Sequence, residues 1–212
     1  MRFSRTGDFE VLDLGQVDYA TTNEQMDLFV QESVENDGPD RLILAEFNPV
    51  LTVGRAENVS SYKQSNLPVF EVPRGGKATY HGPGQLVAYP IIRLEEGVRD
   101  LHAFLSALEV ALIDTVGDFG LEGDRDSRNT GCWVAGRKIA SIGIAVRRWV
   151  TYHGLALNVS TDLEKFRCFD PCGLDPELMT SLEIELGHAP PLLEVKESLV
   201  MRLSQSIGRL TG

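Results

Sequence analysis

Apolar positions along the first half of the chain predict strands and helices in an irregular order. Short apolar runs bounded by turn residues predict strands at 9–14, 41–47, 50–54, 69–72 and 86–92. Apolar side chains at helical spacing predict helices over 18–35 and 101–116. The first helix is followed by Asn36-Asp-Gly-Pro39, a typical stop signal.

The second half of the chain predicts a group of neighbouring strands and a terminal helix. Three apolar runs separated only by short turns predict strands at 132–135, 138–146 and 149–159. A helical turn, a tight turn and a final amphipathic helix are expected at 162–166, 169–173 and 190–210. Because strands and helices are mixed irregularly, we expect an α/β (α+β) fold in which helices flank a mixed β-sheet.

The middle strand of this group carries apolar or small residues on both faces, which predicts a sheet covered on both sides. Its two faces are expected to show Lys138, Ala140, Ile142 and Ile144 on one side and Ile139, Ser141, Gly143 and Ala145 on the other. The small side chains of the second face would leave room for a slender ligand.

Residues 74–90 hold four glycines, two prolines and His81, and they lead directly into a predicted strand. One interpretation is a tight hairpin or bulge in which His81 is a packing residue. The other is a ligand-binding segment, because glycine lets a ligand approach the backbone and permits positive φ. Thr79 and Gln85, interleaved with the glycines, favour the second interpretation.

Composition indicates an ordinary globular protein. The 212 residues, with a mass of 23.4 kDa and 42% hydrophobic side chains, are sufficient for one large domain, and we expect a single domain over 1–212. No apolar window approaches the length of a membrane helix, and the first ten residues resemble neither a signal nor a transit peptide. The expected location is the cytoplasm, and three cysteines, an odd number, agree with a reducing compartment.

Charge is distributed unevenly. Segments 72–94 and 127–161 contain no acid and together carry eight cations; since the whole chain carries −11, the other 154 residues carry −19. If the two segments meet in space, they form an electropositive site suited to an anionic substrate or an acidic partner protein. The net negative charge argues against nucleic-acid binding.

Cys172 and Lys138 are the candidates for chemistry. Cys172 lies in Pro171-Cys-Gly173, where the glycine leaves a backbone amide uncovered, and a thiol needs a nearby cation or base to react as the thiolate. Lys138 starts an apolar strand, so a buried amine there could hold the thiolate and move a proton. The alternatives are a buried structural cysteine and a solvated lysine at a strand end.

Other chemistries fit the sequence less well. Cys168 and Cys172 with His81 or His153 could supply zinc ligands, but the spacing is loose and no second cysteine pair exists. His153 is expected to pack beside the site, and Cys132 and Cys168 to have no role in it. No Gly-x-Ser-x-Gly elbow, Walker A motif or dinucleotide fingerprint occurs. We therefore expect no metal and no cofactor.

Four motifs stand out along the chain. They are Arg74-Gly-Gly-Lys-Ala-Thr-Tyr-His-Gly-Pro-Gly-Gln85, Arg137-Lys-Ile-Ala-Ser-Ile-Gly143, Arg148-Trp-Val-Thr-Tyr-His-Gly-Leu-Ala-Leu-Asn158, and Pro171-Cys-Gly173 with Thr180-Ser-Leu182. In order and spacing they cover most of residues 45–185, and together they resemble the lipoyl(octanoyl) transferase family. The resemblance implies a biotin/lipoate protein ligase-like domain and an acyltransferase that takes part in lipoate biosynthesis.

The resemblance also implies roles for individual residues. Cys172 would take octanoyl from octanoyl-acyl carrier protein and pass it to a lysine ε-amine, and Lys138 would activate the cysteine. The acyl site would be lined by Arg74, Gly75, Gly76, Lys77, Ala78, Thr79, Tyr80, His81, Ser141, Ile142, Gly143, Gly154, Leu155 and Ala156. The implied acceptors are lipoyl domains of 2-oxoacid dehydrogenase complexes and the glycine cleavage H protein. The resemblance also implies a monomer that binds neither nucleic acid nor a membrane.

Two other functions remain open at this point. An ATP-dependent lipoate or biotin protein ligase would use the same scaffold but would need an adenylate site and no nucleophilic cysteine. A non-catalytic module that binds acyl chains or acyl carrier protein would gain no covalent octanoyl group.

Overall fold

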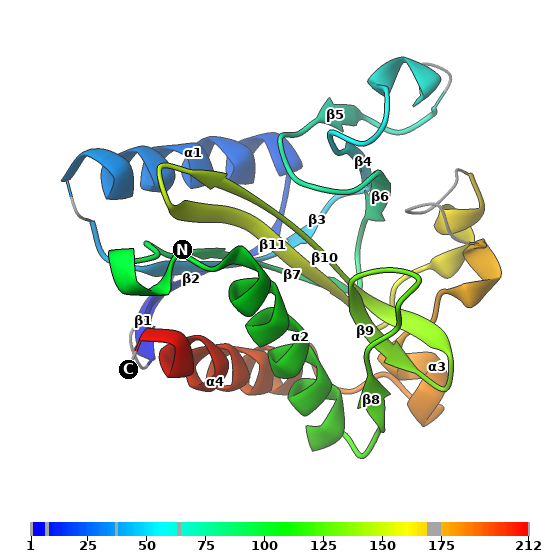
Figure 1. The fold of residues 1–212 in the computed structure, drawn as a ribbon. Helices are drawn as coiled ribbons and strands as arrows, with labels where there is room; N and C mark the ends of the chain where they lie inside the picture. The colour runs from blue at the N-terminus through cyan, green and yellow to red at the C-terminus, as the bar shows by residue number, and fades with distance from the viewer. Residues whose placement is uncertain (1, 7–8, 37, 63–64, 169–174, 212) are drawn as a thin grey trace.

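The computed structural model describes residues 2–6, 9–36, 38–62, 65–168 and 175–211. Within these residues a mixed sheet has eight strands in the order β1-β2-β3-β7-β11-β10-β9-β8, and only β2 and β3 pair in parallel (Figure 1). The strands are β1 (Arg2–Thr6), β2 (Phe9–Val17), β3 (Arg41–Phe47), β7 (Gln85–Ile91), β8 (Gly123–Asp124), β9 (Gly131–Val134), β10 (Arg137–Arg147) and β11 (Val150–Asn158). The predicted mixed sheet is thus present.

Helices cover both faces of this sheet (Figure 1). They are α1 (Tyr19–Asn36), α2 (Leu101–Asp118), α3 (Leu182–Leu186) and α4 (Leu192–Thr211). On one face α1 packs through Met26, Phe29 and Val30 onto apolar residues of β3, β7 and β11. On the other face α2 and α4 lie side by side over the sheet and bury Phe104, Leu108, Leu199 and Leu203. The middle of the sheet is therefore apolar on both sides, as its sequence predicts.

A second, smaller sheet stands beside one end of the large one. Its three strands, in the order β5-β4-β6, are β5 (Val69–Glu71), β4 (Val50–Val53) and β6 (Ala78–His81). Short 3₁₀ helices η1 (Val59–Tyr62), η2 (Glu96–Val98), η3 (Leu163–Cys168) and η5 (Pro176–Leu178) connect the larger elements. Tyr80 of β6, Leu51, Phe166 and Met179 form a separate apolar cluster, which fixes η3 and the residues after η5 against the small sheet.

The start of α2 shows how local sequence sets an element boundary. Asp100 is extended, and its Oδ1 accepts hydrogen bonds from the backbone N–H groups of His102 and Ala103. This N-cap satisfies donors that have no partner within the helix. The helix then buries one stripe of side chains against the sheet.

Several elements differ from the sequence prediction. β1, β8 and α3 are short and were not predicted, β2 continues three residues beyond the predicted end, and β6 lies inside the stretch that was read as a glycine-rich segment. The assignment of faces in β10 is wrong at Ile139, which is buried with Ala140 in the core below α2. A β-bulge between Lys138 and Ala140 shifts the register there, so the strict alternation of faces does not hold.

Among the described residues, no helix is long and apolar enough to cross a membrane.

The α4 interface provides a test of the fold. Leu199 is fully buried under the sheet, whereas Leu193 on the same helix is 65% exposed. Leu199→Ala should lower the free energy of unfolding by about 3 kcal/mol because it removes buried methyl groups and leaves a cavity. Leu193→Ala should change it by less than about 0.5 kcal/mol. Urea unfolding followed by circular dichroism measures both, and equal effects would contradict the described packing.

Candidate active site

A cavity of about 260 Å³ lies where the two sheets meet. Its walls come from α1, β4, the segment before β6, β6 itself, β7, β10 and β11. The lining residues are Tyr19, Thr52, Arg74, Gly75, Gly76, Lys77, Thr79, His81, Tyr89, Asn129, Ser141, Ile142, Gly143, His153, Gly154, Leu155 and Ala156. These described lining residues include no acid, and many of them come from the two acid-free segments of the sequence, which therefore do meet.

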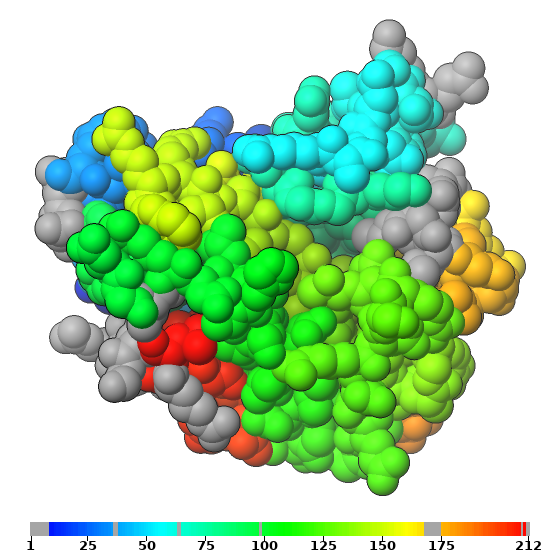
Figure 2. All heavy atoms as spheres, viewed as in Figure 1, coloured from blue at the N-terminus to red at the C-terminus, as the bar shows by residue number. Residues whose placement is uncertain are grey.

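The cavity has an open side and a closed side. The lining residues of β10, of segment 75–77 and Asn129 are exposed or half-buried, whereas those on β11, β7 and α1 are buried. In Figure 2 the segment that follows β5 (teal) and β10 (yellow-green) lie next to each other on the face shown. A ligand entering beside β10 would point its far end toward β7 and α1.

Glycines bring the backbone together at the open side. Gly75 N–H donates to the Ile144 carbonyl at 2.9 Å, so this hydrogen bond joins the glycine segment to the edge of β10. A Cβ on Gly143 would lie 3.0 Å from Arg74 Cδ and 3.1 Å from the Gly75 carbonyl. Gly76 has φ of 82°, in the left-handed region that favours glycine. Gly75, Gly76 and Gly143 thus form a wall of bare backbone.

The other two glycines of the stretch have structural causes. A Cβ on Gly82 would clash with the Tyr80 ring, and Gly84 has φ of 79° with the Ser160 carbonyl 2.6 Å from its Cβ position. Both lie in the turn between β6 and β7. This half of the stretch is therefore a tight turn, but not a hairpin, because β6 and β7 belong to different sheets. The other half forms the cavity wall.

Arg74 is a buried cation in the cavity wall. Its Nη2 donates to the Thr52 carbonyl at 2.9 Å and to Thr52 Oγ1 at 3.0 Å, and its Nη1 donates to the Gly75 carbonyl at 2.9 Å. These bonds fix the guanidinium in the wall and keep positive charge beside the glycine backbone.

Buried polar groups continue from Arg74 across both sheets, and we call them the polar row. Thr52 Oγ1 lies 3.2 Å from His81 Nε2, and His81 Nδ1 lies 2.7 Å from Gln85 Oε1. Gln85 Nε2 donates to Asn158 Oδ1 at 2.9 Å, and Asn158 Nδ2 donates to the Thr180 carbonyl at 3.0 Å. Because Gln85 Oε1 only accepts, His81 carries its proton on Nδ1, and Thr52 donates to Nε2.

Both histidines of the cavity are held neutral. Burial lowers the pKa of His81 to about 4; the nearby Arg74 acts in the same direction, against the hydrogen bond to Gln85. Burial also lowers the pKa of His153 to about 3, and Arg74 and His81 add to this effect. Desolvation disfavours the charged imidazolium in each case.

Lys138 is 1% exposed, so the alternative of a solvated lysine at a strand end is wrong. Its Nζ donates a hydrogen bond to Asn129 Oδ1 and lies 5.9 Å from the centroid of the Trp133 ring. Asn129 in turn lines the open side of the cavity. The buried amine is therefore joined to the cavity through one amide side chain.

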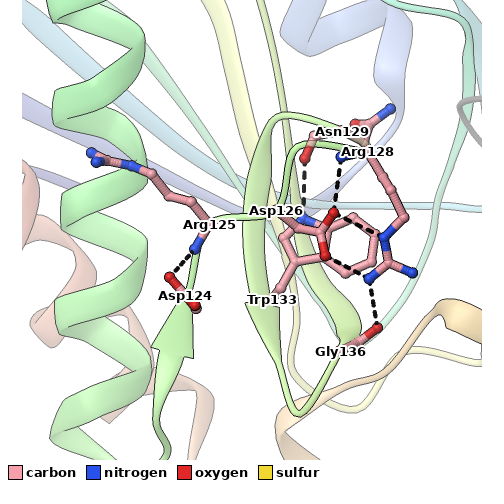
Figure 3. A network of polar contacts seen from close by, with 7 residues as sticks. All are labelled: Asp124, Arg125, Asp126, Arg128, Asn129, Trp133 and Gly136. Atoms are coloured by element: carbon pink, nitrogen blue, oxygen red, sulfur yellow. Dashed lines mark hydrogen bonds and ion pairs between the residues drawn. The ribbon is translucent and has the colours of Figure 1, made fainter.

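The turn that carries Asn129 is held by several contacts (Figure 3). Asn129 N–H donates to the Asp126 carbonyl at 3.3 Å, and its own carbonyl accepts from Trp133 Nε1 at 3.0 Å. Arg128 binds both carboxylate oxygens of Asp126, at 2.8 and 2.6 Å, and its guanidinium lies 4.4 Å from the Trp133 ring centroid. The two-point ion pair and the ring contact restrain the turn before β9.

Cys172 lies outside the described residues, within 169–174. The chain on both sides of this segment is described, and Arg167 Nη2 contacts Glu177 Oε1 at 2.7 Å across it. Met179 forms a parallel bridge with Lys138, and Thr180 N–H donates to the Lys138 carbonyl at 2.9 Å. The chain that follows the segment therefore lies against the backbone of Lys138.

The structure brings most of the predicted acyl-site residues to one cavity. Twelve of the fourteen line it, and the exceptions are Ala78 and Tyr80. These two point to the opposite face of β6 because side chains alternate along a strand, and Tyr80 packs against Phe166 instead. Sequence reasoning did not place five lining residues in the site: Tyr19, Thr52, Tyr89, Asn129 and His153.

Signals for the missed residues were weak. His153 was expected beside the site, and it lies in the cavity wall. Asn129 lies in an acid-free segment, which is the only sequence feature that could have drawn attention to it. Cys132 is a buried free thiol, and burial raises its pKa to about 12, which agrees with a structural cysteine. Among the described residues no group of His, Cys, Asp and Glu could hold a metal ion.

Comparison with known proteins first defines the class. Lipoate-protein ligase A bound with ATP aligns with a TM-score of 0.74 at 15% identity, covering 95% of this chain and 86% of that chain. A biotin protein ligase from Aquifex aeolicus aligns with a TM-score of 0.56 at 11% identity, covering 94% and 68%. The expected fold of the biotin/lipoate protein ligase type is confirmed.

Sequence comparison then defines the family. Residues 18–204 match the lipoyl protein ligase A/B catalytic domain. The octanoyltransferase of Syntrophobacter fumaroxidans is 42% identical over 206 residues, covering 94% of this chain and 90% of that protein. The octanoyltransferase of Solibacter usitatus is 45% identical over 191 residues, covering 87% and 86%. The chain therefore belongs to the octanoyltransferase family of enzymes, as its motifs indicated.

The lowered pKa of His81 predicts a loss of stability in acid. The unfolded state takes up the proton near pH 6.5 and the folded state only near pH 4, so stability falls as the pH drops through this window. Between pH 7.5 and pH 5.0 His81 should account for a loss of about 2 kcal/mol. His81→Gln should remove that share of the pH dependence in urea unfolding.

The control for this measurement is His102→Gln, because His102 is exposed on α2. It should leave the pH dependence as in the parent. If His81→Gln also leaves it unchanged, His81 is not held neutral by its buried position.

Proposed function

We propose that this enzyme moves an octanoyl group from octanoyl-acyl carrier protein to a lysine ε-amine of a lipoyl domain through a thioester on Cys172. The observation that carries the proposal is the buried amine of Lys138, joined through Asn129 to an acid-free cavity lined largely by apolar groups and bare backbone. Membership of the octanoyltransferase family supports octanoyl as the transferred group and a protein as its acceptor. The anchoring of Met179 and Thr180 beside Lys138 supports an approach of Cys172 to the amine.

The proposed cycle begins with Cys172 as a thiolate and Lys138 as an ammonium ion. The thiolate attacks the donor thioester carbon, and backbone N–H groups of Cys172 and of the glycine segment stabilise the oxyanion. When the carbon–sulfur bond of the donor breaks, Lys138 gives its proton to the departing thiolate, and the carrier leaves as a thiol. The octanoyl group is then held on Cys172.

The second half of the cycle restores both groups. The neutral acceptor amine attacks the Cys172 thioester, the sulfur leaves as a thiolate, and Lys138 accepts the proton that the amine releases. Cys172 and Lys138 would titrate as a coupled pair, because the thiolate and the ammonium ion stabilise each other. The products are an octanoyl amide and the starting enzyme.

Substrate binding follows from the cavity and its charge. Burial of the acyl tail contributes about 0.8 kcal/mol for each methylene, so an eight-carbon chain gains several kcal/mol. Arg74 and Lys77 are the cations in the cavity wall, within the acid-free part of an otherwise acidic chain. An acidic carrier protein would be attracted to this side and repelled elsewhere.

The proposal predicts a covalent intermediate. After incubation with octanoyl-acyl carrier protein, intact-mass analysis of the parent enzyme should show one octanoyl group, and peptide mapping should place it on Cys172. Cys172→Ser should show no stable adduct and lose transfer to a lipoyl domain, whereas Cys132→Ser, a change at a buried structural thiol, should keep the adduct. Transfer that survives in Cys172→Ser and requires ATP would instead identify a ligase.

The contact between Asn129 and Lys138 predicts a positioning role for the amide. Asn129→Ala should lower kcat by roughly tenfold to a hundredfold with little change in KM, because the amine is no longer held in place during proton transfer. Asn129→Asp should keep an acceptor for Nζ but raise the pKa of Lys138, so its pH–rate profile should move to higher pH. Steady-state transfer measures both.

Glu122, exposed just before β8, provides the matched control, and Glu122→Ala should behave as the parent. Parent-like kcat in Asn129→Ala, or unchanged pH profiles in both Asn129 variants, would show that the amide does not position the amine.

A further inference from the structure

A second hollow adjoins the cavity at its open side, and we call it the groove. It has a volume of about 520 Å³, and its walls are the first turns of α2, residues 127–130, the glycine segment 75–76 and β10. Its described lining residues include no acid. Cavity and groove share five lining residues: Gly75, Gly76, Asn129, Ile142 and Gly143. A ligand in the cavity can therefore continue into the groove.

The cavity and the groove lie on opposite faces of the large sheet. Tyr19 of α1 lines the cavity, whereas Leu101 and Leu105 of α2 line the groove. These two helices cover different faces of the sheet (Figure 1). In Figure 2 the start of α2 (green) and β10 (yellow-green) lie next to each other below the teal segment. A chain that occupies both hollows must therefore cross the sheet at the edge of β10.

At this crossing point one edge of β10 has no neighbouring strand. β9 pairs with β10 as far as Gly131, opposite Ser141, and Gly75 N–H then binds the Ile144 carbonyl. Ile142 lies between these contacts, and its N–H and carbonyl point to the same edge as those of Ile144, because every second residue of a strand faces the same neighbour. Among the described residues, no backbone hydrogen bond reaches Ile142 at this edge. Such an unpaired edge position can bind a further chain that carries amides.

The walls of the groove combine apolar and polar groups. Its apolar side chains are Leu101, Leu105, Ile142 and Ile144. The hydroxyls of Ser127 and Thr130 are exposed in the same hollow. Arg128, the cation of the groove wall, is already bound to Asp126, so the groove has little net charge. This combination fits a neutral chain that carries both amides and methyl groups.

The pantetheine arm of an acyl carrier protein has this chemistry, with amides, a hydroxyl and geminal methyl groups beside the thioester. The acceptor lysine must also reach the reacting groups, but its side chain is a row of methylenes that carries no amide. An acyl tail in the cavity and an arm in the groove would place the thioester between the two hollows. Asn129 lies there and binds the Lys138 amine. The reacting carbon would then lie beside the proposed proton donor.

We propose that the groove binds the pantetheine arm of the acyl donor, with an amide of the arm bonded to the free backbone edge of Ile142 and its methyl groups against Leu101 and Leu105. This inference rests on the proposed function and adds a donor-binding site to it. The acyl tail then lies on the α1 face of the sheet, and the carrier protein approaches from the α2 face.

The test compares two octanoyl donors that differ in the arm. Octanoyl-pantetheine carries the whole arm, and the octanoyl thioester of N-acetylcysteamine lacks the geminal methyl groups. The double variant Leu101→Asn/Leu105→Asn should lower kcat/KM for octanoyl-pantetheine by about tenfold, because it removes the apolar wall, and should keep that of the short donor within about twofold. Retained transfer from the short donor also shows that the variant is folded. Equal losses with both donors, or no loss with octanoyl-pantetheine, overturn the proposal.

The control variant is Leu193→Asn, because Leu193 is 65% exposed on α4 and does not line the groove. It should behave as the parent with both donors. Octanoyl-acyl carrier protein should lose as much as octanoyl-pantetheine in the double variant, and a loss confined to the carrier protein would assign Leu101 and Leu105 to a protein contact and overturn the proposal.

A single-turnover measurement separates the donor from the acceptor. Double-variant enzyme already carrying octanoyl should pass it to a lipoyl domain at the parent rate, and a loss in this step alone would assign the groove to the acceptor lysine and overturn the proposal. If the parent forms no octanoyl adduct from any donor, the proposed function fails and the inference with it. If the parent forms the adduct but the double variant treats both donors alike, only the assignment of the groove fails.

Discussion

The polar row is the constraint on which the site depends. It runs from Arg74 through His81 and Gln85 to Asn158, and it joins the small sheet to the large one through buried side chains. Within this row each donor faces an acceptor, and the loss of one member leaves its neighbours unpaired at about 1–3 kcal/mol for each group. The row therefore permits one relative position of the sheets, and the cavity between them keeps its shape.

The same row connects the cavity wall to the chain around the reacting groups. Asn158 holds the Thr180 carbonyl, and Thr180 N–H binds the Lys138 carbonyl. His81 and Arg74 are thus engaged within the row, and the amine of Lys138 is held against Asn129 at the cavity.

The sequence predicts those parts of the fold that depend on local periodicity. The three long helices, β10 and β11 follow from apolar spacing, and the acyl-site motifs mark most of the cavity wall. The resemblance takes 74–81 as one segment and so includes Ala78 and Tyr80, but β6 is a strand, and its alternating faces turn these two side chains away from the cavity. Ile139 was placed on the wrong face because no sequence signal announces the bulge beside it.

The remaining residues of the site could not be predicted because only tertiary contacts bring them there. Asn129 is one polar residue in a turn, and only its hydrogen bond with the buried Lys138 amine identifies it as a residue of the site. Tyr19 and Thr52 come from α1 and β4, far from the motifs in sequence, and reach the cavity through the packing of the two sheets. The local pattern of apolar and polar residues does not encode such long-range contacts.

The central claim is that the Lys138 amine supports the Cys172 thiolate, and the rate of alkylation by iodoacetamide as a function of pH tests it most directly. With Cys132 and Cys168 replaced by alanine, Cys172 should react with an apparent pKa well below the ordinary value of about 8.5. Lys138→Met, which keeps the length of the side chain without its charge, should return that pKa to about 8.5 or above. Superimposable profiles for the two proteins would contradict the account.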